Sequence, residues 1–239
     1  MAATGRPRIA LLAPMGSELR PLLKRLSLQR TQAGKPPVYE GAHGAVDIVA
    51  TTTSMGTVAA AAAAERVLDT GPVDRVVVVG IAGGVDPAFA IGEVFVPTVV
   101  IDGATGTEYT PHPFGDLEPR GKLSTSDEFI VDHSRLARMA ADGVVAVDME
   151  TSAVAAVCER RGTPWSVFRA ISDRAHEGDV EMLNLANPDG SPNAGYALKY
   201  VVRHPGKLPF LFRLAQGATK AANAAADACV RACAQQRSA

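Results

Sequence analysis

Cysteine is scarce in this sequence, and neither sign of charge dominates. The three cysteines among 239 residues are Cys158, Cys229 and Cys233, and such a sparse, odd-numbered set does not make a disulfide framework. Cys229 and Cys233 lie one helical turn apart, but no histidine or carboxylate pattern completes a metal site with them. The 24 basic and 25 acidic residues leave a formal net charge of −1, which argues against a broad basic face for nucleic acid.

Long hydrophobic runs are also missing. The first residues, MAATGRPR, lack the apolar stretch of a signal peptide, and no run approaches the roughly 18–20 apolar residues of a membrane span. We therefore expect a cytoplasmic protein without stable membrane insertion. The G-x-G-x-x-G and G-x-x-x-x-G-K-[ST] fingerprints are absent too, so the sequence implies no metal and no redox cofactor.

What is present is a series of short apolar runs that alternate with helical patterns. Strand-like runs cover 8–13, 44–53, 74–80, 91–102, 143–150 and 165–171, and helical patterns cover 16–28, 56–69 and 151–162. Ser17 is the expected N-cap of the first helix, Gly162 closes the third, and Pro97 indicates a sheet edge or a bulge. The alternation predicts an α/β three-layer sandwich with a mostly parallel central sheet, built as a single domain over 1–239.

Polar residues follow several of these strands. Glu18, the SMG turn at 54–56, a glycine-rich turn GIAGG at 80–84, the run Asp148 to Glu150, and Ser172 with Asp173 all come after apolar runs. In an open parallel sheet, ligands bind at the carboxyl ends of the strands. Taken singly, each carboxylate is an ordinary helix-terminal acid and the glycines a tight turn. Together they predict one site at one rim.

The Pro/Gly-rich stretch 103–121 is expected to be an irregular surface loop, and it contains Tyr109, His112 and Phe114. His176 is expected at the surface, and the other histidines show no ligand spacing.

Four segments of the chain resemble a known family. RIALLAPMGSEL, GIAGGVDPAFAIGEVFVPTVV, TSDEFI and VDMETSAVAAVCERRGTPWSVFRAISDRA are similar to the signatures of the nucleoside phosphorylase superfamily, with the methylthioadenosine/S-adenosylhomocysteine nucleosidases as the most similar branch. The segments cover most of 8–176, and the remaining 177–239 is a divergent, helical C-terminal segment. The resemblance implies a nucleosidase that releases adenine from 5′-modified adenosines, works without a cofactor and forms a homodimer.

The resemblance also implies roles for individual residues. Asp173 matches the general acid that protonates N7 of the leaving purine, and Ser172 orients it. Glu18 matches the acid that positions and activates the attacking water. The matched substrate-binding positions are Glu150 at the ribose hydroxyls, Met149 under the sugar, Phe129 stacking on the base with the Ile130 backbone nearby, Met55 and Met15 beside the ribose and water, and Asp148, Ile81, Ala82, Gly83 and Arg169.

Two other functions stay open. A phosphorylase needs an arginine-rich anion cradle, yet Val79 precedes the glycines, Arg75 lies at the far end of its strand, and Arg20 follows Glu18. Hydrolysis is therefore favoured over phosphorolysis. A non-catalytic nucleoside-binding protein would be expected to lack Asp173 or Glu18.

The C-terminal segment leaves the 5′ substituent open. KLPFLFRLA at 207–215 resembles the hopanoid-associated phosphorylases, whose nucleoside, such as adenosylhopane, carries a large apolar 5′ group. The segment could line an apolar entrance or touch a membrane. The simpler interpretation is a helix packed on the core or on a neighbouring subunit.

Overall fold

The structure is a computed structural model that describes residues 5–32, 34, 36–177, 187 and 193–236. The strands are β1 (Arg8–Ala13), β2 (Gln29–Gln32), β3 (Val38–His43), β4 (Val46–Thr52), β5 (Arg75–Gly84), β6 (Val94–Phe95), β7 (Val99–Asp102), β8 (Glu108–Tyr109), β9 (Lys122–Thr125), β10 (Val144–Asp148) and β11 (Trp165–Arg174). The helices are α1 (Gly16–Leu26), α2 (Thr57–Asp69), α3 (His133–Ala141), α4 (Thr151–Arg161), η1 (Ala175–Glu177), α5 (Ala194–Arg203), η3 (Pro205–Lys207) and α6 (Leu208–Ala234).

The described strands form one 11-stranded sheet in the order β2-β3-β4-β1-β5-β10-β9-β7-β8, with β11 paired to β5 and β6. The long central pairs β4–β1–β5–β11 are parallel, and so are β10–β9–β7. Antiparallel pairs occur at the edges and where β5 meets β10. The predicted α/β class is confirmed, with a mixed sheet whose centre is parallel.

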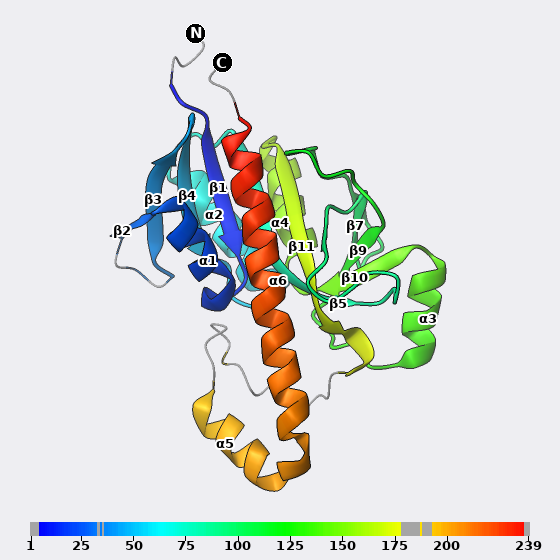
Figure 1. The fold of residues 1–239 in the computed structure, drawn as a ribbon. Coiled ribbons are helices and arrows are strands. Elements are labelled where there is room, and N and C mark those ends of the chain that lie inside the picture. Colours follow the sequence, from blue (N-terminus) through cyan, green and yellow to red (C-terminus); the bar gives the residue numbers. More distant parts are fainter. Residues whose placement is uncertain (1–4, 33, 35, 178–186, 188–192, 237–239) are drawn as a thin grey trace.

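Helices cover both faces of the sheet (Figure 1). Side chains alternate along a strand, so Ile9 and Leu11 of β1 pack in the cluster that contains residues of α1 and α6, whereas Ala10 and Leu12 pack in the cluster that contains residues of α2 and α4. The apolar strands are thus buried on two sides. This burial explains why they appear in the sequence as continuous apolar runs.

The segment GIAGG is strand rather than the predicted turn. β5 runs on through Gly84, and its last residues pair with β11 on one side and with β10 on the other. Gly83 lies opposite Val147, and Gly84 lies opposite Ala146. A Cβ on Gly84 would come within 2.9 Å of Ile171 Cγ2. The glycine there permits close packing of neighbouring strands, which the local sequence does not distinguish from a turn.

Two further boundaries differ from the prediction. The expected strand at 91–102 is broken into β6 and β7 on either side of Pro97, because proline has no N–H to donate to a sheet. Met15, not Ser17, is the N-cap of α1. The Glu18 side chain satisfies a backbone donor at this end of the helix, accepting from Met15 N at 2.9 Å, so Ser17 is left exposed to solvent.

The expected surface loop at 103–121 contains the short strand β8 and one buried ring. Phe114 is only 6% exposed and meets the Phe168 ring edge-on, with centroids 6.2 Å apart. The Arg75 guanidinium lies over the Phe114 ring, with its Cζ 5.1 Å from the ring centroid. The surface prediction is therefore wrong for Phe114, because its burial depends on β11, far along the chain.

The C-terminal helix α6 crosses one face of the sheet and extends beyond it (Figure 1). Its buried residues are all small and include Gly217, Ala221, Ala225, Cys229 and Cys233. Small side chains allow a helix axis to come close to the strands beneath. No helix in the described part of the chain is long and apolar enough to cross a bilayer.

Candidate active site

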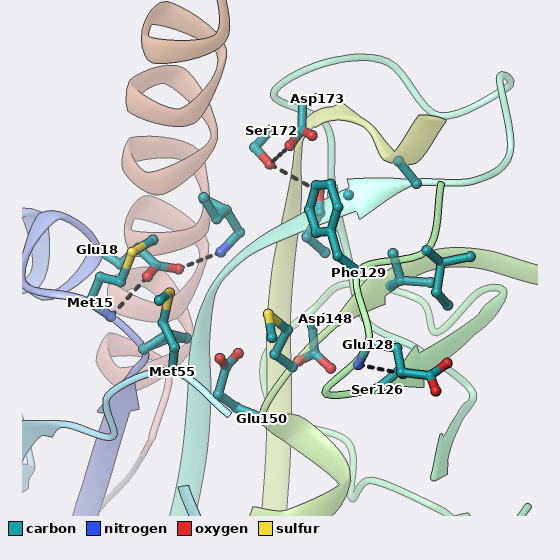
Figure 2. A pocket seen from close by; sticks show the side chains of 18 residues that line it. Met15, Glu18, Met55, Ser126, Glu128, Phe129, Asp148, Glu150, Ser172 and Asp173 are labelled. Atoms are coloured by element: carbon teal, nitrogen blue, oxygen red, sulfur yellow. Dashed lines mark hydrogen bonds between the residues drawn. The ribbon is translucent and has the colours of Figure 1, made fainter. Parts of the chain in front are cut away.

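A cavity of about 270 Å³ opens where β1, β5, β10 and β11 end. The predicted site residues that line it are Met15, Glu18, Met55, Ile81, Ala82, Gly83, Phe129, Ile130, Asp148, Met149, Glu150, Ser172 and Asp173. Five further residues line it as well: Pro14, Ser126, Glu128, Val147 and Ala175. Figure 2 shows Asp173 and Ser172 at one end, Glu18 on the side of α1, and Glu150 below Phe129. The expectation of a shared rim is met.

Glu18 projects from the first turn of α1 and is 2% exposed. Its Oε1 accepts a hydrogen bond from Ile81 N at 2.8 Å, while Oε2 accepts from Met15 N at 2.9 Å. Burial raises the pKa of Glu18 to about 7, although the Arg169 charge and the two backbone donors act in the opposite direction. A carboxyl group with this pKa can accept or release a proton near neutral pH.

Gly80 makes room for this carboxyl group. A Cβ on Gly80 would overlap Glu18 Oε1 and the Arg169 guanidinium and would come within 3.0 Å of Pro14 Cδ. Its backbone is not in the left-handed region, so the residue is small for reasons of space and not of conformation. The absence of a side chain at this position allows β1, α1 and β5 to bring their groups together.

Arg169 lies beneath the cavity and does not line it. Its side chain is fully buried, and Nη2 donates to Asp148 Oδ2, to Thr151 Oγ1 at 3.0 Å and to Glu150 Oε2 at 3.4 Å. Nη1 donates to the Ile81 carbonyl at 3.1 Å. The prediction that Arg169 binds substrate is therefore wrong in placement, because both terminal nitrogens donate to protein acceptors and the residue does not line the cavity. Its buried Nε has no hydrogen-bond partner among the described residues. Arg169 orients the residues that do line the cavity.

Asp148 lines the cavity, but its carboxylate is already engaged. Besides Arg169 it accepts from Thr125 Oγ1 at 2.6 Å and from the Thr151 backbone at 3.2 Å. A carboxylate has about four acceptor positions, and most of them are taken here. Asp148 thus anchors the end of β10 rather than presenting a free oxygen to a ligand.

Glu150 precedes α4 and is 4% exposed. Its Oε1 accepts from Gly56 N at 3.2 Å, which connects it to the turn that carries Met55. Burial and, secondarily, the nearby Asp148 charge raise the pKa of Glu150 to about 8, although the Arg169 charge acts in the opposite direction. The side chain lies at the bottom of the cavity in Figure 2, facing the open space.

Asp173 occupies a bulge near the end of β11, where the register against β5 shifts between Ile171 and Asp173. Ser172 Oγ is 3.2 Å from the Ala82 carbonyl and also hydrogen-bonds to Asp173 Oδ1. A hydroxyl has one proton, so both bonds form together when Asp173 is protonated and donates. Burial raises the pKa of Asp173, as does the charge of Glu177, whereas a bond donated by Ser172 lowers it.

The loop before α3 supplies the aromatic wall of the cavity. Phe129 projects toward Asp173 (Figure 2), and Ile130 beside it is buried. Asp127 accepts from Thr57 N at 2.8 Å, so the loop is bonded to the start of α2. Asp127 and the lining residue Ser126 were not among the predicted site residues, although both fall within the TSDEFI motif.

The charge on the cavity wall is of one sign. Among the described residues that line it, the ionisable side chains are the carboxyl groups of Glu18, Glu128, Asp148, Glu150 and Asp173. The described part of the chain also contains no cluster of three or more side chains suited to a metal ion. The arrangement can donate and accept protons and can stabilise positive charge.

A second, wider cleft of about 620 Å³ lies between α1 and α6 and adjoins the first through Met15, Glu18 and Ile81. Arg20 and Lys24 line it, one helical turn apart and both exposed. Arg25 lines it too, but bonds to Asp227 at 2.5 Å.

Comparison with known proteins places these observations in context. A family model described as "Phosphorylase superfamily" matches residues 8–120 and 116–204. The 5′-methylthioadenosine/S-adenosylhomocysteine nucleosidase of Tolumonas auensis is 27% identical over 199 residues, covering 70% of this chain and 86% of the relative. The enzyme of the same name from Exiguobacterium sp. is 29% identical over 201 residues, covering 71% of this chain and 86% of the relative.

Solved structures share the fold. S-adenosylhomocysteine nucleosidase from Streptococcus pyogenes superposes with a TM-score of 0.77 at 20% identity, covering 99% of this chain and 100% of that one. Futalosine hydrolase from Helicobacter pylori superposes with a TM-score of 0.69 at 17% identity, covering 93% and 95%.

Proposed function

The chain belongs to the phosphorylase superfamily, and on that premise we propose that it is a nucleosidase that hydrolyses the N-glycosidic bond of 5′-modified adenosines. Methylthioadenosine and S-adenosylhomocysteine are the proposed substrate type, since the curated relatives above carry those names. The observation that supports the proposal most is the cavity in which Asp173, Glu18 and Glu150 surround one space. Adenine and the 5′-modified ribose would be the products.

Departure of the base is the first chemical demand. As the N-glycosidic bond breaks, negative charge develops on the purine and positive charge on the ribose. A proton delivered to N7 relieves the charge on the base. We assign that delivery to Asp173, because burial raises its pKa and favours the neutral acid that must donate. General acid catalysis of this kind contributes about 10²–10⁴ in rate.

Activation of the attacking water is the second requirement, and we assign this role to Glu18. Its pKa of about 7 allows it to act as the base that takes a proton from water at neutral pH. Glu150 is proposed to bind the ribose hydroxyls, with Met149 and Met55 packed around the sugar. Carboxylate charge near the sugar also stabilises its developing positive charge.

Phosphorolysis is the alternative, and the described wall of the cavity disfavours it. No described lining residue carries a positive charge, and the backbone donors of Met15 and Ile81 that could hold an anion are already bonded to Glu18. The Arg75 guanidinium donates a hydrogen bond to Ser166 Oγ and lies over the Phe114 ring. One observation favours the alternative: Arg20 lines the adjoining cleft.

The test is adenine release from methylthioadenosine, S-adenosylhomocysteine and adenosine, each with and without phosphate. We expect release that does not depend on phosphate, with the two 5′-thio substrates turned over faster than adenosine. Release only with phosphate would move the assignment to a phosphorylase. Binding without release from any of them would support a nucleoside-binding protein. A homodimer is proposed from the resemblance, and light scattering of the purified chain tests it.

A further inference from the structure

The start of α6 and the helix before it expose apolar side chains away from the sheet. Val202 in α5 is 72% exposed, and Leu208 and Phe212 in α6 are 53% and 66% exposed. Leu208 and Phe212 are four residues apart in one helix, so they share a face. Among the described residues, the other exposed large apolar side chains are those of Val58 in α2 and Val131.

These helices form a projection of the molecule. α5 and the first part of α6 extend beyond the sheet, at the end opposite the two termini (Figure 1). Tyr200 of α5 is 2% exposed and packs against Tyr196 and His204, with ring centroids 6.5 and 4.8 Å away. The aromatic face of α5 is therefore the inner one, and Val202 lies on the outer one.

Positive charge accompanies the exposed apolar groups. From Asn193 to Ala226 the sequence contains no Asp or Glu. Its basic residues are Lys199, Arg203, Lys207, Arg213 and Lys220. Lys199 and Arg203 are exposed on α5 and, being four residues apart, share a face. Arg213 is paired with Glu177 at 2.9 Å, and Lys220 donates to the Ile91 carbonyl.

We propose that this projection, defined by Lys199, Val202, Arg203, Leu208 and Phe212, docks on an anionic lipid surface. Helices that lie in a membrane interface combine exposed Phe and Leu with Lys and Arg. Anionic lipid attracts such basic residues over about one Debye length. A second copy of the chain fits less well, because a two-fold contact through this face would bring like charges together.

The experiment uses the full chain and vesicles of phosphatidylcholine with and without phosphatidylserine. We expect the protein to sediment with the phosphatidylserine vesicles, to sediment much less with phosphatidylcholine alone, and to be released as salt is raised. Lys199→Gln with Arg203→Gln should weaken binding, by about fivefold for each cation removed. Equal binding to both kinds of vesicle would overturn the electrostatic part of the proposal.

The apolar part has its own variant and a matched control. Leu208→Ser with Phe212→Ser should weaken binding to phosphatidylserine vesicles by about tenfold or more, since both side chains lose apolar burial. Val58→Ser removes an equally exposed apolar side chain at another site, 83% exposed, and should bind as the original chain does. Circular dichroism confirms that each variant folds.

Two results would overturn the proposal that this projection docks on anionic lipid. One is a chain that fails to sediment with either vesicle at low salt. The other is a self-associated chain that Leu208→Ser with Phe212→Ser converts to monomers while vesicle binding is unchanged, which would make this face a contact between copies.

Discussion

Glu18 is buried and Asp173 is half-buried, and both carboxyl groups have raised pKa values, but their hydrogen-bond partners differ. Glu18 accepts from two backbone N–H groups, and such donors stabilise a carboxylate. Asp173 has a serine hydroxyl as its partner, which can accept as well as donate. Two carboxyl groups in different settings can serve as acid and base in one site.

Replacing Asp173 by Asn should remove the acid while keeping the shape of the site. We expect Asp173→Asn to lower kcat for adenine release by about 10²–10⁴, with little change in the affinity for an unreacted nucleoside. Adenine release and equilibrium binding measure the two effects. Ser172→Ala is the graded comparison, since it removes only the orienting partner. An Asp173→Asn variant with normal kcat would exclude the proposed acid.

The pH dependence should identify Glu18. Because its pKa is raised to about 7, the carboxylate needed for water activation forms only as pH rises through that value. We expect kcat/KM to increase with pH through that region and then to level off. Glu18→Gln should bind nucleoside without hydrolysing it. Glu108→Gln, on an exposed edge strand, should keep the original profile.

Arg169 holds several carboxyl groups through one buried guanidinium. Replacing it by Met would leave Asp148, its principal partner, buried without a counter-charge. Breaking a buried pair in this way costs about 3–5 kcal/mol of unfolding free energy. We expect Arg169→Met to lower Tm strongly in a thermal melt, whereas Arg161→Met, which removes surface pairs with Glu65 and Asp69, should change Tm little, because exposed ion pairs contribute little to stability.

At the scale of elements, the packing of α6 on β11 supports the acid. Gly217 of α6 is buried, and a Cβ there would overlap the Ser172 carbonyl oxygen and lie 3.3 Å from Ile91 Cγ2. The helix thus fits closely over the backbone that carries Asp173. A backbone atom cannot move aside as the end of a long side chain can.

Gly217→Ala should therefore displace α6 from β11. Although alanine favours a helix by about 1 kcal/mol over glycine, the overlap should outweigh it and destabilise the protein by about 1–3 kcal/mol. We expect a lower Tm and reduced adenine release. Gly206→Ala, where a Cβ meets nothing within 4 Å, is the control. A Gly217→Ala variant with unchanged Tm and activity would contradict this account of the contact.

At the scale of the whole molecule, the buried carboxyl groups should make stability depend on pH. Burial raises the folded pKa values of Glu18 and Glu150 to about 7 and about 8, both above the ordinary value of 4.5. Groups with raised pKa values bind protons more tightly in the folded state, so their contribution is greatest below the unfolded pKa. It is lost as pH rises through the folded pKa.

We therefore expect the unfolding free energy to fall as pH rises from about 5 to about 8. Urea unfolding at several pH values measures it. Glu150→Gln cannot ionise, so its unfolding free energy should vary less with pH than that of the original chain. A Glu150→Gln variant with the same dependence on pH would show that Glu150 is not the source.

The sequence by itself determined the central strands, the helices α1, α2 and α4, and the edge at which the site lies, but not β2, β3, β9 or α3. Apolar runs of the right length predict strands wherever both faces are buried, and carboxyl ends of parallel strands meet at one edge. Glu18 and Asp173 could be placed together from those rules, because β1, β5 and β11 run parallel. Glu150 follows β10, which runs antiparallel to β5, so the rule about parallel strands does not by itself place it there. The family motifs led to the roles of Met55 and Phe129.

Only the tertiary structure decided how the site is held. The bond from Ile81 to Glu18 and the pairing of Arg169 with Asp148 join residues far apart in the chain, and no local pattern encodes them. The same is true of GIAGG, whose glycines permit close packing instead of a turn. Burial and charge set the pKa values of the carboxyl groups, and both arise from neighbours that the folded chain brings together.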